Sequence, residues 1–149
     1  MRFLRYLVLL CLVSLCFAAC QRSEAPEAAP PPAAAPAPAP APFRVSGIDL
    51  GNAIGADKRV AAPGSSFAAT DTIYASVATE GASPSVTLVA RWTYQDGQLV
   101  SEETQTIAPT GAAVTEFHIA KPDGWPAGGY QVEVIANGAS AGTRAFQVQ

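Results

Sequence analysis

Apolar residues from position 43 onward recur at every second position, which is the period of a β-strand with one buried face. Between positions 86 and 94, every second residue is apolar or aromatic, whereas Arg91 belongs to the opposite face. The same alternation returns near 73–77, 117–119, 130–134 and 146–148. No part of this region keeps the i, i+3, i+4 spacing of an amphipathic helix. The pattern therefore predicts an all-β domain over residues 43–149.

Turn residues divide this region into short strands. Asp96-Gly97 and Asn137-Gly138 are typical of tight hairpins, because Gly reaches a positive φ without steric cost. Residues 80–84 and 108–111 are looser connections rich in Gly and Pro. We expect strands near 43–50, 71–79, 86–95, 98–107, 113–120, 129–136 and 142–149, with a shorter one near 58–61. About seven antiparallel strands in so short a region predict a β-sandwich.

Two aromatic residues indicate which kind of β-sandwich to expect. Trp92 lies midway along the third long strand, on its inward phase, and Tyr130 opens the sixth after the turn-rich segment 122–129. This order of features resembles an immunoglobulin-like domain, in which a tyrosine often occupies that corner. The resemblance implies an antiparallel immunoglobulin-like β-sandwich. It concerns the architecture only, because the inter-sheet cysteines of antibody domains are absent.

The first 20 residues have the features of an export signal. Arg2 and Arg5 give a positive start, Tyr6 to Ala19 form an apolar run of 14 residues, and Cys20 follows Phe17-Ala18-Ala19. A membrane-spanning helix needs about 20 apolar residues, so the run favours a cleaved signal. The ending resembles the lipobox of bacterial lipoproteins, with Phe17 where Leu is usual. We therefore expect a lipoprotein signal peptide over 1–19.

The lipobox resemblance implies a lipid on Cys20. The thiol would carry diacylglycerol through a thioether, the freed amino group would be acylated, and several acyl chains would hold the protein to a membrane. The alternative is an ordinary secretory signal cleaved after Ala19, leaving Cys20 as a free thiol. Gln21 is not the Asp that retains lipoproteins in the inner membrane, so the resemblance favours the outer membrane, facing the periplasm.

Residues 20–42 are predicted to be a lipidated cysteine followed by a linker. Residues 21–42 contain eight of the 13 prolines, and most of the rest are Ala. Such a segment has no side chains large enough to form a core, and it favours polyproline II. At about 3.1 Å per residue, it spans up to roughly 70 Å. We interpret it as a spacer; a PxxP ligand for a partner is the alternative.

Composition excludes several classes of function. After removal of the leader, seven Lys and Arg remain against twelve Asp and Glu, with no basic run, which argues against nucleic-acid binding. His118 is the one histidine, on the outward phase of a strand, and the mature domain has no cysteine beyond Cys20. Glu102 and Glu103 face opposite sides of a strand. We therefore expect no enzyme activity, no metal site and no cofactor.

Binding candidates are confined to the connections between strands. Trp125, beside Gly and Pro, would either anchor a ligand or close one end of the sandwich, and the second interpretation is favoured. Residues 51–70 form the longest irregular stretch, where Lys58 and Arg59 add positive charge.

These features together predict a non-enzymatic envelope lipoprotein whose tethered sandwich binds or positions another envelope component, a protein or a polymer. The alternative is an inhibitor or regulator of an exported hydrolase, such as a protease or muramidase, acting through the loop at 51–70 or 122–129.

Overall fold

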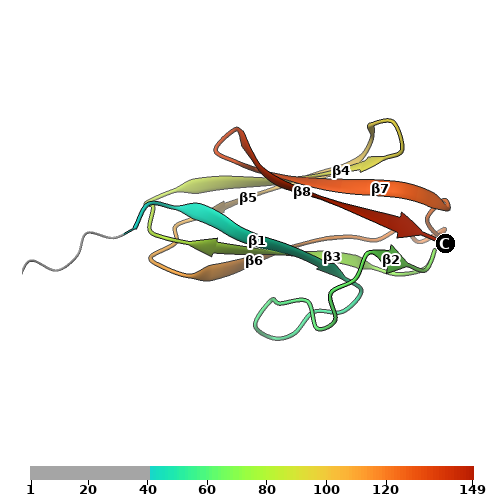
Figure 1. Ribbon diagram of the computed structural model, residues 1–149, viewed down its shortest axis with the longest axis horizontal. Helices are drawn as coiled ribbons and strands as arrows, with labels where there is room; N and C mark the ends of the chain where they lie inside the picture. The colour runs from blue at the N-terminus through green and yellow to red at the C-terminus, as the bar shows by residue number, and fades with distance from the viewer. Residues whose placement is uncertain (1–40) are drawn as a thin grey trace, which may run out of the picture. The chain divides into compact units, whose positions relative to one another are not determined.

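Two β-sheets face each other across an apolar core in the computed structural model, which describes residues 41–149 (Figure 1). The predicted signal peptide 1–19, Cys20 and nearly all of the predicted linker lie outside the described residues. The strands are β1 (Arg44–Gly51), β2 (Ser66–Phe67), β3 (Ile73–Glu80), β4 (Val86–Tyr94), β5 (Gln98–Ile107), β6 (Ala113–Ile119), β7 (Gly128–Ala136) and β8 (Ala139–Val148).

The seven long strands confirm those expected from the alternation, to within three residues at each end. The largest difference is at β8, which begins at Ala139 rather than 142 because Ala136 already pairs with Ala139 across the turn. Asn137 and Gly138 have φ of 49° and 82°, the left-handed values that a two-residue hairpin requires. Between Val134 and Ile135, the register of pairing with β8 shifts by one residue at a β-bulge.

The short strand expected near 58–61 is wrong. Only Val60 in that stretch pairs, in an isolated bridge to Ile54, because the segment folds back on itself as a loop. The short strand of the structure is β2, which pairs in parallel with the end of β8. Its two residues give no alternation that a sequence pattern can reveal.

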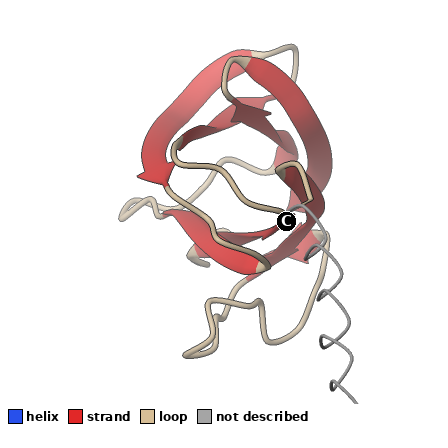
Figure 2. Ribbon diagram, turned by 90° about the vertical axis from the view of Figure 1, so that its left-hand side faces the viewer, coloured by secondary structure: helices blue, strands red, loops and turns tan. Residues whose placement is uncertain are grey.

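The strand order is that of an immunoglobulin-like sandwich. One sheet has the order β1-β3-β6 and the other β2-β8-β7-β4-β5, and every pair except β2–β8 is antiparallel. Figure 2 shows the two sheets as opposite layers around the interior. The fold is therefore all-β, as the sequence predicts.

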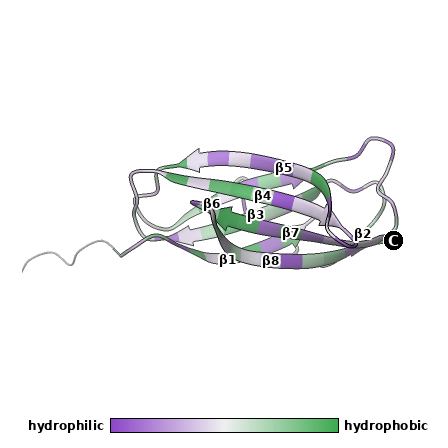
Figure 3. Ribbon diagram, turned by 90° about the horizontal axis from the view of Figure 1, so that it is seen from above, coloured by the Kyte–Doolittle hydropathy of each residue, from purple (hydrophilic) through white to green (hydrophobic). Residues whose placement is uncertain are grey.

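The core is the inward phase of each strand, and Figure 3 shows hydrophobic and hydrophilic residues alternating along them. Trp92 and Phe117, which come from different sheets, are fully buried. Phe146 lies at the centre of an aromatic group, with its ring centroid 6.0 Å from that of Trp92, 5.3 Å from Tyr130 and 5.6 Å from Phe67. Burying these large side chains is the main favourable contribution to folding.

One side chain bridges the two sheets along each open side of the sandwich. Gln105 of β5 donates from Nε2 to the carbonyl oxygen of Glu116 in β6, at 2.7 Å. On the other side, Arg144 of β8 donates from Nε to the carbonyl oxygen of Ile48 in β1, at 2.8 Å. Both acceptors belong to strands at the edge of their sheet. These bonds satisfy edge carbonyls that no neighbouring strand reaches.

Tyr130 forms the tyrosine corner that the resemblance implies. Its hydroxyl donates to the carbonyl oxygen of Pro126, four residues earlier, at 2.9 Å. Its ring is 4% exposed. Burial, with a smaller contribution from neighbouring Tyr94, raises the pKa of Tyr130 above its ordinary value of 10.0. The hydroxyl therefore stays protonated to a higher pH in the folded protein than in the unfolded chain.

We predict that Tyr130→Phe lowers the free energy of unfolding by about 1 kcal/mol at neutral pH, because the carbonyl of Pro126 loses its partly buried hydrogen bond. The difference from the wild type should shrink above about pH 10. There the wild-type unfolded chain loses a proton that the folded state retains, so its stability falls with pH. Urea unfolding between pH 7 and 11 measures both effects.

Tyr74→Phe is the matched control, because the Tyr74 ring lies half-exposed on the outer face of β3 and its hydroxyl makes no hydrogen bond to another described residue. It should change stability by less than about 0.5 kcal/mol. Equal losses from the two substitutions would contradict the assignment of the corner hydrogen bond.

Candidate functional site

A cavity of about 640 Å³ opens at the end of the sandwich where β4 finishes and β5 begins. One wall is the start of β5, residues 98–101, and the facing wall is residues 118–121 at the end of β6. Aromatic residues contribute the remaining surface: Tyr94, Trp125 and Tyr130. The size is within the range of ligand sites in proteins. The cavity therefore lies between the unpaired edges of two strands from different sheets.

Trp125 borders this cavity but is held firmly in the wall. Its backbone N–H donates to the carbonyl oxygen of Ala69 at 2.7 Å, and its indole Nε1 donates to that of Asp71 at 2.9 Å. Its ring packs edge-on against Tyr130, with centroids 6.0 Å apart, and the residue is 7% exposed. The structure thus places Trp125 as a side chain that closes this end of the sandwich, without a free ring face for a ligand.

The segment before Tyr130 is shaped by its glycines. Gly124 has φ of +81°, and Gly128 has φ of +143° with no room for a side chain, since an added Cβ would lie 2.9 Å from the Tyr94 ring. The Tyr94 hydroxyl donates to the carbonyl oxygen of Ala127 at 3.0 Å, and the Gln95 backbone N–H donates to that of Gly129 at 2.8 Å. These contacts fasten the segment to the β4–β5 hairpin and fix the cavity wall.

The accessible surface of the cavity is a mixture of apolar and polar groups, and Lys121 adds a positive charge to one side. Leu99 is 58% exposed and is the large hydrophobic residue that stands out on the surface of residues 41–149. Ser101 and Gln98 offer polar groups, whereas the charged or ionisable residues of the wall are His118 and Lys121. No carboxylate lines this cavity.

His118 lies exposed on the outer side of β6. Its Nδ1 is 3.1 Å from the Glu116 carboxylate, and its ring lies 5.5 Å from that of Tyr74. No serine or threonine hydroxyl is hydrogen-bonded to it among the described residues. The geometry is that of a surface contact between two side chains.

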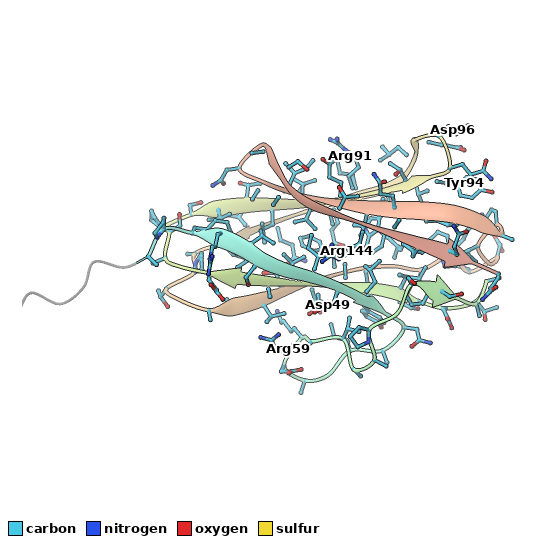
Figure 4. The ribbon with its side chains drawn as sticks, in the orientation of Figure 1. Asp49, Arg59, Arg91, Tyr94, Asp96 and Arg144 are labelled. Atoms are coloured by element: carbon cyan, nitrogen blue, oxygen red, sulfur yellow. The ribbon has the colours of Figure 1, made fainter. Side chains whose placement is uncertain are left out.

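Lys58 and Arg59 lie away from the cavity, on a loop over the outer face of the β1-β3-β6 sheet. The Ser76 hydroxyl donates to the carbonyl oxygen of Lys58 at 2.6 Å, which fixes the loop to β3 and buries Ser76. The Gly55 N–H donates to the carbonyl oxygen of Arg59 at 2.8 Å, forming a tight turn. Figure 4 shows Arg59 at the edge of the molecule, far from Tyr94. The structure therefore does not bring these two residues together with Trp125.

The outer face of the other sheet carries a second charged group. The Arg91 guanidinium donates to Glu102 at 2.9 Å and lies 3.7 Å from Glu133 (Figure 4). The hydrogen bond that Arg91 donates to Glu102 raises the pKa of Arg91 above its ordinary value. Glu103 is opposite Ala90 on the inward phase, so the two neighbouring glutamates face different sides, as predicted. They do not form an acid–base pair.

The opposite end of the sandwich holds the N-terminal residues of the described chain. Pro42 bridges to Ala82 in the turn between β3 and β4, and the Ala82 N–H donates to the carbonyl oxygen of Ala41 at 3.0 Å. Gly81 adopts φ of +87°, and a Cβ there would lie 2.2 Å from the Pro42 carbonyl oxygen. The chain thus enters the domain along a fitted turn, at the far end of β4 from the cavity.

Two further features are absent from residues 41–149. Within this range, no helix is long and apolar enough to cross a membrane. The same residues contain no cluster of three or more His, Cys, Asp or Glu side chains placed to hold a metal ion.

Comparison with known proteins adds likeness of fold only. No family model matches the chain, and no curated protein is close enough to serve as a relative. An immunoglobulin-like protein from Pseudomonas aeruginosa is similar, with 15% identity and a TM-score of 0.48, covering 73% of this chain and 98% of that one. An alkylpurine DNA glycosylase from Pseudomonas fluorescens has 14% identity and a TM-score of 0.46, covering 72% of this chain.

This chain spans 30% of the glycosylase, and it spans 16% of a β-glucosidase from Listeria innocua that is 9% identical, with a TM-score of 0.43. Such low similarities transfer no activity. The assignment of an immunoglobulin-like fold rests on the strand order and the tyrosine corner.

Sequence reasoning missed Leu99 and Lys121 as members of a site. Lys121 lies two residues beyond the end of β6, and Leu99 lies in a strand whose other residues are mostly polar. The one signal in the sequence that points to this end of the domain is a leucine close after a tight Asp-Gly turn, and the structure shows that this leucine is exposed.

We predict that Trp125→Phe destabilises the domain by about 1–3 kcal/mol, because the carbonyl of Asp71 loses its partly buried hydrogen bond and the smaller ring leaves a void. Leu99→Ser, on the exposed rim of the same cavity, should change stability by less than about 0.5 kcal/mol. Chemical denaturation of both variants makes the comparison. A stable Trp125→Phe variant would show that the indole is not structurally needed.

Proposed function

We propose that this protein is a non-enzymatic lipoprotein of the bacterial cell envelope, acylated on Cys20 and facing the periplasm from the outer membrane. Its immunoglobulin-like domain binds or positions another envelope component, a protein or a polymer. The observation that carries the proposal is that the two ends of the domain differ: the chain enters at Pro42 at one end, and the exposed cavity lies at the other.

The geometry supports this proposal through β4, which connects the two ends. The turn before Val86 holds Pro42, and the cavity begins at Tyr94. Nine residues of strand span about 30 Å. A domain held by its Pro42 end presents the cavity on the side away from its attachment. The Ala/Pro-rich segment adds up to roughly 70 Å of reach from the lipid.

The side chains support a binding role over catalysis. His118 is paired with Glu116, Glu102 with Arg91, and Trp125 with backbone carbonyls. Each group that might supply acid, base or nucleophile chemistry in the described domain has a structural partner or stands alone on the surface. The cavity instead offers an exposed apolar rim with one lysine, which suits recognition.

Inhibition of an exported hydrolase remains the second candidate, and the loop at 51–65 favours it. The loop projects from the outer face of the β1-β3-β6 sheet (Figure 1). Backbone hydrogen bonds hold it, including Gly64 N–H to the Leu50 carbonyl oxygen at 2.8 Å and Ala61 N–H to that of Ala53 at 3.0 Å. A pre-ordered loop loses little conformational entropy on binding, which is a property useful to inhibitors. The segment 122–129 fits less well, because Trp125 is buried.

We predict that the mature protein begins at Cys20 and carries acyl chains there. Mass spectrometry of the N-terminal peptide from the membrane fraction should find the mass of a diacylglyceryl group plus an amide-linked acyl chain. Cys20→Ala should leave the leader uncleaved or the protein soluble. An unmodified Cys20 at the mature N-terminus would disprove the lipid anchor and leave the fold unchanged.

We also predict a specific partner in the envelope. Photo-crosslinking in intact cells, with the photoreactive residue replacing Leu99, should give a discrete adduct to one envelope component. The same group at Thr104, further along β5, is the positional control and should give less. Equal, diffuse labelling from both positions would count against a defined binding surface. Protease and muramidase assays with added protein test inhibition.

A further inference from the structure

The four outer edges of the two sheets differ in how they are protected. The edges are β1 and β6 in one sheet and β2 and β5 in the other. β2 has only two residues, and the edges of β1 and β6 are engaged by Arg144 and Gln105 respectively. An unprotected edge strand offers a row of unpaired N–H and C=O groups to any extended segment. The remaining edge, β5, is therefore the one whose outer backbone groups no other described strand engages.

β5 is long and its backbone edge is open, although the Gln105 side chain reaches from it to β6. It has ten residues, and outside its pairing with β4 its backbone makes no hydrogen bond within residues 41–149. The sequence from Gln98 to Ile107 contains neither Lys nor Pro, so its protection against edge pairing is limited to the inward-pointing Glu103 and one bulge. One irregularity interrupts it, a bulge at Val100, which places Leu99 opposite Thr93 and Ser101 opposite Trp92.

The cavity lies directly beside the first part of this edge. Residues 98–101 form one of its walls, and Leu99 stands exposed at the rim. A strand added to β5 projects alternate side chains towards the interior side of the sheet. Those side chains would cover the opening between β5 and β6. The cavity is thus placed to receive a side chain from an added strand.

The charges of the wall restrict what such a segment contains. Lys121 makes no ion pair with another described residue, and His118 already lies 3.1 Å from Glu116. No Asp or Glu lines the cavity. An acidic side chain on the incoming segment is therefore favoured beside Lys121, and an aliphatic one against Leu99.

We propose that the free edge of β5 binds an extended segment of a partner protein, which adds a sixth strand to this sheet. The segment places an aliphatic side chain against Leu99 and an acidic side chain beside Lys121. The inference rests on the proposed binding function and specifies its partner as a peptide segment rather than a polymer.

Two other occupants fit less well. A second copy of the domain, pairing symmetrically and antiparallel about Glu102 or Glu103, would set that glutamate opposite the same residue of its partner, and like charges there are unfavourable. A sugar would require an exposed aromatic face, but Trp125 and Tyr130 are 7% and 4% exposed. An extended acidic–aliphatic peptide meets neither obstacle.

The test uses the mature protein purified from membranes in detergent and a fluorescein-labelled peptide, Thr-Val-Thr-Glu-Thr-Val-Thr. Fluorescence anisotropy measures affinity, and hydrogen–deuterium exchange locates the bound peptide. We expect slowed exchange in β5 and in residues 118–121. A peptide with Pro at its fifth position should bind more weakly, because it cannot complete the pairing.

Three variants sharpen the test. Leu99→Thr should weaken binding about tenfold through lost apolar contact. Lys121→Glu should weaken it about threefold to fivefold, and replacing the peptide glutamate by lysine should restore affinity for this variant. Arg44→Glu makes the same change of charge at the opposite end of the sandwich, where Arg44 pairs with Glu80, and should bind as the wild type does.

The proposal is overturned if the peptide fails to bind at about millimolar concentration, or if the protected amides lie elsewhere. It is also overturned if Leu99→Thr and Lys121→Glu bind as tightly as Arg44→Glu. A dimer in sedimentation that Leu99→Thr abolishes would assign the edge to a second copy instead. A crosslinked partner without peptide binding would overturn this inference alone, whereas absence of any partner would remove the proposed function as well.

Discussion

The apolar layer between the two sheets is what the rest of this domain depends on, because residues 41–149 contain no cysteine that would join the sheets covalently. Trp92, Phe117 and Phe146 bring large side chains into this layer from three strands. Their burial sets the register of every strand, since a slip by one residue would turn each of them to solvent. The hydrogen bonds of Gln105 and Arg144 then close the two sides of a layer that hydrophobic packing has already formed.

The same constraint explains which parts of the fold the sequence reveals. A strand such as β4, with Val86, Leu88 and Trp92 on one face, shows its period directly, and its bounds were predicted within a residue. β2 has two residues and no period, and Val60 belongs to a loop that merely resembles a strand. Tyr130 was placed correctly because its corner depends on a local turn. Short or irregular pieces depend on tertiary contacts that the sequence does not display.

The candidate site was harder to predict, for a related reason. The sequence favoured Trp125 as a residue that closes one end of the sandwich, but not its partner: the hydrogen bond to Asp71 joins positions 54 residues apart. Leu99 looked like an ordinary strand residue until the structure showed an exposed edge beside it. Lys58 and Arg59 proved to be on a different face from the cavity. A site formed between two sheets combines residues that are close in space but far apart along the chain.

The entry of the chain at Pro42 has a mechanical consequence. If the domain is held at Pro42 while something pulls on the cavity end, the load runs along the strands. The hydrogen bonds between β1 and β3, from Arg44–Glu80 to Gly51–Tyr74, are then strained together in shear. Hydrogen bonds strained in parallel resist far more force than bonds opened one after another. The domain would therefore behave as a stiff link under tension along its long axis, and would yield readily only when β1 is peeled away from its side.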